Sequence, residues 1–589
     1  MPVHLIKPIT AYAQSISNES FINSCTNITA PGYYILNNSI QGIQGKGYCI
    51  GIFSNNVILN GQGNSLSMSF VNGTGIYISP ISHNIIIENM SLSDFNIGIS
   101  ANGHNITIEN IKGLFDGVVI SINNSKINVE NAFLLDNFIY GINATGNNIL
   151  INNSNIIDSG SGLYINGSNV RLDYIKLTNG GVYLTPNSKN FSINSVSVND
   201  KPLVYLNYTS NVLISNAGEV IAFNSRNLSL YNMNLGSSAV GAELYNVNFS
   251  RLINISGSDY LYGIYIVGNN NTIKNVTGSS NQEIYVEGNY NLIETANLTL
   301  DTFYGIHLLG NHNVIRDIET QMTAYGVNIT GNYNIIENII ANDDYGSGLS
   351  VTGNYNEIYN ASLKDINVRG YSIGMNVSGN YNEIKYIVSI DNAYGLNVSG
   401  INNTINEINV SLNRYGFFME GLYNKVSIVT LYNNMLIGFS LNGSDNLITS
   451  IQEDLNLYGF NISGSGNVIK NITSDNNNVL GLYIKGNYNK ISYFYVENAG
   501  QDGIIINGDY NNLNNVLAEN NIYYEVNNGI NITGDYNKVT NAYIENFLLA
   551  GINITGNKNL IINVTSSNNS YAFNITGNNN ILYEVKAIH

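Results

Sequence analysis

The most frequent chemical motif in this sequence is the Asn-x-Ser/Thr sequon, which occurs about 32 times. A chain with this content of Asn, Ser and Thr would contain roughly half as many by chance, so the excess is real, although part of it comes from repetition. An accessible asparagine in this motif can receive an N-linked glycan in a secreted protein. The candidate acceptors are Asn27, Asn72, Asn105, Asn143, Asn166, Asn207, Asn254, Asn275, Asn328, Asn376, Asn397, Asn461, Asn471, Asn531, Asn553 and Asn574.

The two cysteines, Cys25 and Cys49, are the second group with obvious chemistry. Their separation equals about one repeat of the chain described below, which would bring their backbones near the spacing that a disulfide requires. The alternative is a pair of free, buried thiols. A disulfide would favour an oxidising compartment outside the cytoplasm.

The acidic pairs Asp343-Asp344 and Glu453-Asp454 are the best candidates for acid–base chemistry. Glycoside hydrolysis needs two carboxyl groups that converge on a cleft, and adjacent residues on a strand point to opposite faces. We therefore interpret these residues as solvated turn acids and predict that the chain is not an enzyme. A polysaccharide lyase or hydrolase remains an alternative.

His83 and His104 are the remaining candidates for metal binding, because each precedes a turn asparagine in what look like successive coils. Soft metals need clustered Cys, Met or His ligands, and this chain has 2 Cys and 8 Met. An exposed turn histidine is the ordinary explanation of both residues. We expect no metal and no cofactor.

The elements that must position these residues come from one repeat, Tyr-Gly-apolar-x-apolar-x-Gly-Asn-x-Asn-x-Ile. Clear copies begin at Tyr325 and Tyr394, and the turn glycine returns about every 21 or 22 residues. The coils are rich in Ile, Val, Tyr and Thr, which favours strands over helices. The pattern predicts an all-β fold, a single-stranded right-handed parallel β-helix of about two dozen coils.

Alternation along each coil predicts which side chains face outward. In the segment 551–556, Ile552 and Ile554 fall on one face and Asn553 on the other. Repeated turns should also stack like side chains, such as Tyr333 on Tyr355, into ladders. We interpret the tyrosine ladder as structural, with a sugar-binding platform as the alternative. Glycans in adjacent coils would crowd, so we expect partial occupancy there.

Composition limits the partners and the organisation of the chain. The net charge is -17 with no basic stripe, which argues against nucleic acid, and no apolar run is long enough to span a membrane. Hydrophobic residues make up 44% of the chain, enough to fold rather than stay disordered. We expect a tail and cap segment with the disulfide over 1–50, irregular coils over 51–260 and regular coils over 261–589.

Several segments resemble the N-terminal coils of NosD-like β-helix proteins from archaea, which are related in fold to pectate-lyase-like chains. They are 26–36, 49–52, 57–63, 198–206 and 217–221, and with the Tyr-Gly repeats the resemblance covers nearly the whole chain. It implies a secreted or surface-attached β-helix, in some members with carbohydrate binding. Copper delivery, the role of the founding type, carries over poorly because the ligands are scarce.

These features together predict an extracellular, N-glycosylated structural protein of the cell surface. The segment Asn574–Gly577 begins an ordinary coil, and no capping helix or charged strand follows it in this sequence. An uncovered β-helix end favours stacking on the next molecule, so we expect end-to-end self-association into filaments or a coat, or contact with other surface proteins. A carbohydrate-binding adhesin is the alternative.

Overall fold

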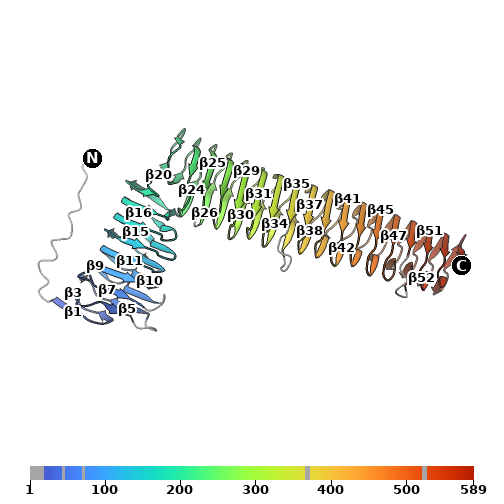
Figure 1. Ribbon diagram of the computed structural model, residues 1–589, viewed down its shortest axis with the longest axis horizontal. Coiled ribbons are helices and arrows are strands. Elements are labelled where there is room, and N and C mark those ends of the chain that lie inside the picture. Colours follow the sequence, from blue (N-terminus) through green and yellow to red (C-terminus); the bar gives the residue numbers. More distant parts are fainter. Residues whose placement is uncertain are drawn as a thin grey trace. The chain divides into compact units, whose positions relative to one another are not determined.

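The computed structural model describes residues 19–42, 47–68, 73–186, 188–259, 261–364, 372–520 and 527–588. The candidate acceptor Asn72 lies outside these residues. Every regular element within them is a β-strand (Figure 1), as the composition of the coils predicts. The described segments contain no helix long and apolar enough to cross a membrane.

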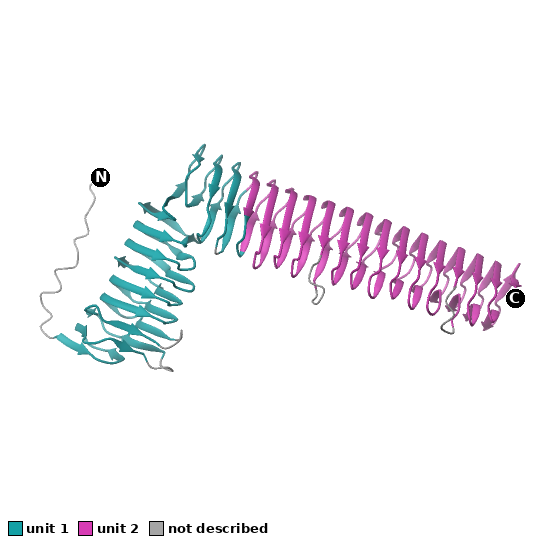
Figure 2. Cartoon of the chain, in the orientation of Figure 1, with its two compact units in different colours: residues 1–268, 278–281 teal, residues 269–277, 282–589 magenta. Residues whose placement is uncertain are grey.

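The chain divides into two compact units (Figure 2). Unit 1 consists of residues 1–268 and 278–281, and unit 2 consists of residues 269–277 and 282–589. Both are parallel β-solenoids in which each coil hydrogen-bonds to the next coil, apart from one interruption in unit 1. The prediction of a right-handed parallel β-helix is confirmed.

Unit 1 begins with coils whose strands stack in parallel. Its first stack runs through β2 Thr26–Ile28, β5 Tyr48–Ile52, β8 Thr74–Ile78, β10 Ile97–Ala101, β12 Val118–Ile122, β15 Tyr140–Ile157, β16 Gly162–Thr178 and β17 Gly181–Leu184. Its second stack includes β6 Val57–Asn60, β9 His83–Ser93, β11 His104–Leu114 and β13 Ile127–Glu130. Register brings Ile99, Ile120 and Ile142 into one fully buried column. Burial of such columns supplies most of the stability of the coils.

The parallel stacking of unit 1 is interrupted after β17. Strands β19 Ser197–Val198 and β20 Lys201–Asn207 form an antiparallel pair, and a new parallel stack then runs from β20 to β22 Glu219–Phe223 and β24 Val240–Tyr245. Both faces of β22 and β24 are buried, because β17 approaches β24. The sequence repeat gives no indication of this interruption.

Unit 2 is regular and contains two long parallel stacks. The first comprises β28 Gln282–Glu287, β30 Tyr304–Leu309, β32 Tyr325–Thr330, β34 Ser347–Thr352, β36 Ile373–Ser378, β38 Tyr394–Ser399, β40 Tyr415–Glu420, β42 Ile437–Asn442, β44 Tyr458–Ser463, β46 Leu480–Lys485, β48 Ile504–Asn507, β50 Ile530–Thr533, β52 Ala550–Thr555 and β54 Tyr571–Thr576. The second comprises β29 Leu292–Thr299, β31 Val314–Gln321, β33 Ile335–Asn342, β35 Glu357–Lys364, β37 Glu383–Ile390, β39 Thr404–Ser411, β41 Lys425–Tyr432, β43 Leu447–Asp454, β45 Val468–Asp475, β47 Lys490–Glu497, β49 Asn512–Glu519, β51 Lys538–Glu545, β53 Leu560–Ser567 and β55 Ile581–Tyr583.

The turns of unit 2 explain the repeated Gly-x-x-Asn spacing. Gly331 adopts a φ of 152°, and a Cβ atom there would lie 1.8 Å from the carbonyl oxygen of Gly310 in the preceding coil. Only glycine fits this close approach between backbones. Asn334, three residues later, is fully buried, and its Nδ2 donates to the same carbonyl at 3.0 Å. This hydrogen bond links each coil to the preceding coil.

Candidate functional site

Seven candidate acceptors share one outward column on the first stack of unit 2. Register pairs Asn376 with Asn397, and it pairs Asn531, Asn553 and Asn574 in three successive coils. Asn328 and Asn461 occupy the same column farther along. Six of the seven are half-buried and Asn574 is exposed, whereas their strand neighbours Ile552 and Ile554 are buried. The predicted outward phase of this column agrees with the structure.

The amide groups of adjacent acceptors are hydrogen-bonded to one another. Asn397 Nδ2 donates to Asn376 Oδ1 at 2.9 Å, and Asn553 Nδ2 donates to Asn531 Oδ1 at 3.0 Å. A sugar attached to Nδ2 replaces only one of its two hydrogens. The ladder contact can therefore survive modification, but neighbouring coils lie only about 4.8 Å apart.

Asn328 and Asn461 differ from the other members because no acceptor lies beside them. Asn328 stands between His307 and Ser350. Asn461 stands between Ser440 and Tyr483. A glycan on either residue would have no second glycan in the adjoining coil.

Four other candidates lie within strands but at positions with positive φ, outside this column: Asn105, Asn254, Asn275 and Asn471. Asn105 Nδ2 donates to Asn84 Oδ1 at 2.7 Å, so this acceptor belongs to a ladder of asparagines with positive φ. Asparagine tolerates the left-handed conformation better than most residues, which explains its repetition at these positions. The sequon excess is thus partly a product of this backbone conformation.

The remaining described candidates are scattered over unit 1. Asn27 and Asn207 are exposed, whereas Asn143 and Asn166 are half-buried. The Oδ1 atom of Asn166 accepts from Thr185 Oγ1 at 2.9 Å. The structure therefore does not gather all candidate acceptors into one site, and N-glycosylation itself stays a prediction.

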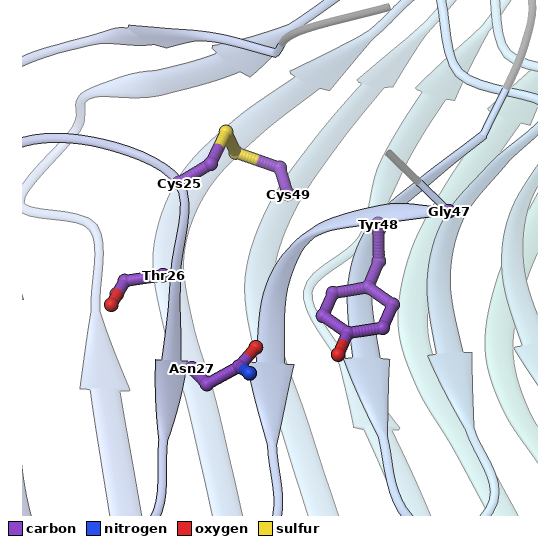
Figure 3. Close-up of a pocket in the computed structure, with 6 residues that line it drawn as sticks. All are labelled: Cys25, Thr26, Asn27, Gly47, Tyr48 and Cys49. Carbon is purple, nitrogen blue, oxygen red and sulfur yellow. A yellow bond between two sulfur atoms is a disulfide. The ribbon is translucent and has the colours of Figure 1, made fainter. Parts of the chain in front are cut away.

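A disulfide joins Cys25 to Cys49, as predicted from their spacing. Beside it lies a hollow of about 340 Å³ that is lined by both cysteines, Thr26, Asn27, Gly47 and Tyr48 (Figure 3). One face of the Tyr48 ring stacks on Tyr77, with the ring centroids 5.4 Å apart. The candidate acceptor Asn27 lies in this hollow, so a glycan on Asn27 would project from it.

The predicted tyrosine ladder forms on the turns of unit 2. The rings of Tyr333 and Tyr355 stack at 4.9 Å between centroids with an interplanar angle of 2°. His312 and Tyr381 extend the stack on either side at 5.0 and 4.9 Å. Because each ring covers its neighbour, the stack presents ring edges to solvent. Flat stacking of a sugar needs a free ring face, so this geometry favours the structural interpretation.

The acidic pairs differ from the sequence-based interpretation. Asp344 and Glu453 are fully buried, so the prediction of solvated turn acids is wrong for both. Asp344 Oδ1 accepts from the Thr323 backbone N–H at 2.9 Å, and Glu453 Oε2 accepts from Asn477 Nδ2 at 2.7 Å. Burial raises the pKa of Asp344 to about 6 and that of Glu453 to about 7. Asp343 is half-buried, so alternation does hold within that pair.

A column of acidic side chains runs along the C-terminal ends of the strands in the second stack of unit 2. Asp454, Asp475, Glu497, Glu519 and Glu545 occupy the same register position in five successive strands. Burial, together with Glu497 and Asp454, raises the pKa of Asp475. Like charges directly opposite each other on neighbouring strands are destabilising.

Sequence reasoning missed a pair of buried carboxyl groups in unit 1, Glu219 and Glu243. Both side chains are fully buried. Glu219 Oε2 accepts from the Val182 backbone N–H at 2.9 Å, and Glu243 Oε2 accepts from the Leu184 backbone N–H at 3.2 Å. Burial raises the pKa of Glu219 well above its usual value and that of Glu243 to about 8. Neither residue belongs to the repeat, which is why periodicity did not find them.

His83 and His104 lie in successive coils, paired in register between β9 and β11 as their sequence positions suggest. Both are exposed. Within the segments that the structure describes, no group of three or more His, Cys, Asp or Glu side chains is placed to hold a metal ion.

No protein-family model matches the chain, and no curated protein is similar to it in sequence. Similar solved structures include the catalytic domain of a GH87 alpha-1,3-glucanase in complex with nigerose, at 14% identity and a TM-score of 0.17, covering 59% of this chain and 62% of the glucanase chain. The alginate lyase AlyF-OU02 is 9% identical with a TM-score of 0.17, covering 75% of this chain and 82% of the lyase. A mutant of the periplasmic alginate epimerase AlgG is 10% identical with a TM-score of 0.13, covering 80% and 78%.

These neighbours contradict the prediction that the chain is not an enzyme, because each of them is an enzyme built on a β-helix. The prediction rested on the absence of a recognisable arrangement of catalytic residues in the sequence. At these identities the likeness shows the fold alone and transfers neither residue nor substrate. The chain spans about three fifths of the glucanase structures. The NosD-like relationship is not shown and stays a prediction.

Proposed function

We propose that this chain is an extracellular, N-glycosylated structural protein of the cell surface whose solenoids assemble end to end. The outward column of sequon asparagines in unit 2 carries the proposal, because it sets acceptors in register along one face. The disulfide supports an oxidising compartment. The fold offers a long, regular surface in which every coil repeats the same outward positions.

Glycan occupancy is expected to follow the spacing of acceptors within this column. Asn328 and Asn461, which have no neighbouring acceptor, should be fully occupied in protein purified from its native source. Asn531, Asn553 and Asn574 should share no more than one or two glycans per molecule, because adjacent coils lie about 4.8 Å apart. Intact-glycopeptide mass spectrometry measures occupancy at each position.

Two matched variants separate crowding from poor access. Replacing Asn553 with Gln should raise occupancy at Asn531 and Asn574, whereas the same change at Asn328 should leave other positions unaltered. Native protein without any glycan would contradict the glycosylation proposal. Equal, full occupancy in all three adjacent coils would contradict the crowding argument.

Self-association is proposed through β55, whose apolar side chains are exposed although the register partners in β53 include buried ones. Leu582 is 39% exposed, whereas Ile561, its register partner in the preceding coil, is fully buried. Ile581 and Tyr583 beside it are also exposed. Covering these side chains with a second molecule would bury apolar surface.

Leu582→Lys tests this assembly, because it places a charge between the exposed side chains of Ile581 and Tyr583. Sedimentation velocity of the full chain should show concentration-dependent oligomers for the wild type and monomers for Leu582→Lys. Leu447→Lys, on the outer surface of unit 2, is the control and should assemble normally. Wild-type protein that stays monomeric at all concentrations, with no fibres by negative-stain microscopy, would refute end-to-end assembly.

A further inference from the structure

The strongest unassigned feature of the molecule is the unpaired edge of β17 in unit 1. Of the strands in the described segments, β17 pairs with β16 alone. Successive N–H groups on a strand point to opposite edges, and those of Val182 and Leu184 point away from β16. A row of unpaired buried backbone donors is costly, so this edge needs acceptors from elsewhere.

Glu219 and Glu243 supply those acceptors from β22 and β24. Glu219 receives the Val182 N–H through both carboxyl oxygens, at 2.9 and 3.2 Å, and Glu243 receives the Leu184 N–H at 3.2 Å. Tyr245 donates its hydroxyl to the other oxygen of Glu243 at 2.7 Å. These two side chains therefore replace a neighbouring strand as the hydrogen-bond acceptors along this edge of β17.

The fit around Glu219 is tight. A Cβ atom on Gly181 would lie 2.5 Å from Glu219 Oε2 and 2.5 Å from the Ala239 backbone nitrogen. Glycine at this position therefore lets the carboxyl group reach the edge of β17. Any side chain there would displace the carboxyl group or the strand.

The surroundings of the pair are acidic or phenolic. In addition to burial, the neighbouring Glu243 and Asp259 raise the pKa of Glu219. Glu243 likewise adds to the effect of burial in raising the pKa of Tyr183, Tyr245 and Tyr262. Farther from the pair, Tyr164 contributes to the raised pKa of Tyr183, and Tyr265 contributes to that of Tyr245. None of these groups carries a positive charge. An ionised pair would therefore place two negative charges in a buried environment without a compensating cation.

We propose that Glu219 and Glu243 form an acid-stabilised latch, in which neutral carboxyl groups take the place of a paired strand along β17 and release it as they ionise. Burial raises the pKa of both groups above the value that they would have in an opened state, where each is solvated. For an acid shifted in this direction, the stabilisation is complete below the opened-state pKa and is lost as the pH rises through the closed-state pKa. The latch therefore weakens between about pH 5 and pH 8.

Amide hydrogen exchange of the full chain tests the latch at the backbone groups that it holds. In peptides covering 181–184, protection should fall by about tenfold per pH unit for each carboxyl group that ionises on opening, between about pH 5 and pH 8, after correction for intrinsic exchange rates. Protection of β33 in unit 2 should be the same in Glu243→Gln as in the wild type at each pH. Glu243→Gln, which keeps an acceptor without a titrating proton, should reduce the slope, and Glu130→Gln, on the outer face of unit 1, should not.

Gly181→Ala should abolish protection of 181–184 at every pH, because the added methyl group displaces Glu219. If one glutamine variant fails to fold by circular dichroism, the pH profile of the other glutamine variant, compared with that of the wild type, decides the question. Constant protection of 181–184 in the wild type would overturn the latch. A wild-type slope that persists unchanged in both Glu219→Gln and Glu243→Gln would also overturn it.

Discussion

Replacing Asn356 with alanine is expected to lower the free energy of unfolding of unit 2 by about 3 to 5 kcal/mol. Asn356 is fully buried. Its Oδ1 accepts from the Asn334 backbone N–H at 2.9 Å, and its Nδ2 donates to the Gly331 carbonyl at 3.0 Å. Alanine would leave both backbone groups buried without a partner, and each such group costs about 1 to 3 kcal/mol.

Urea unfolding followed by circular dichroism, supported by hydrogen exchange of β33 and β35, measures this effect. Exchange is needed because a solenoid can lose cooperativity between its coils. Asn297→Ala, at an exposed position on β29, is the control and should change stability by less than about 0.5 kcal/mol. An equally small change for Asn356→Ala would refute a stabilising role for the buried asparagine ladder.

Stability should rise as the pH is lowered from about 8 to about 4, unlike that of proteins held by surface ion pairs. Burial raises the pKa of Asp116 to about 7, that of Asp344 to about 6 and that of Glu453 to about 7. Unfolding returns each group to a pKa near 4, so the unfolded chain binds fewer protons between these values. Ionisation of each group is expected to lower the free energy of unfolding by roughly 3 kcal/mol across that pH range.

The matched variants are Asp344→Asn and Asp343→Asn. Asp344 occupies a position where other coils carry buried asparagine, such as Asn413, so an amide should fit there. Asp344→Asn should raise the melting temperature at about pH 8 and leave it nearly unchanged at about pH 4. Asp343→Asn, at a half-buried position, should alter neither. A wild-type melting temperature that is flat or falls toward acid pH would contradict the prediction.

The regular part of the fold could be predicted because its information is local and repeated. A glycine such as Gly331 is needed wherever two coils approach closely, and an asparagine such as Asn334 follows it three residues later. One coil therefore predicts the next. The disulfide followed from the same period. The outward column through Asn397 and Asn553 followed from strand alternation alone.

What the sequence did not reveal depends on packing between non-repeating segments. Glu219 and Glu243 look like ordinary strand-edge acids until β17 is known to lie against β24. Asp344 was hidden by one extra residue in its coil. It lies three residues before Ser347, whereas Asn413 lies two residues before Tyr415, which holds the same register position as Ser347.

The unbroken asparagine ladder also bears on how such a chain can change length over generations. The Asn356 N–H reaches Asn382 Oδ1 at 2.8 Å across 26 residues, although most steps of the ladder span 21 or 22. Extra residues between Asn356 and Asn382 therefore leave the ladder intact, whereas a deletion between Gly353 and Asn356 would remove the contact of Asn356 with the carbonyl oxygen of Gly331. Homologues are therefore expected to differ in length by whole coils and by insertions between the ladder asparagines, while the spacing from the turn glycine to the buried asparagine stays the same.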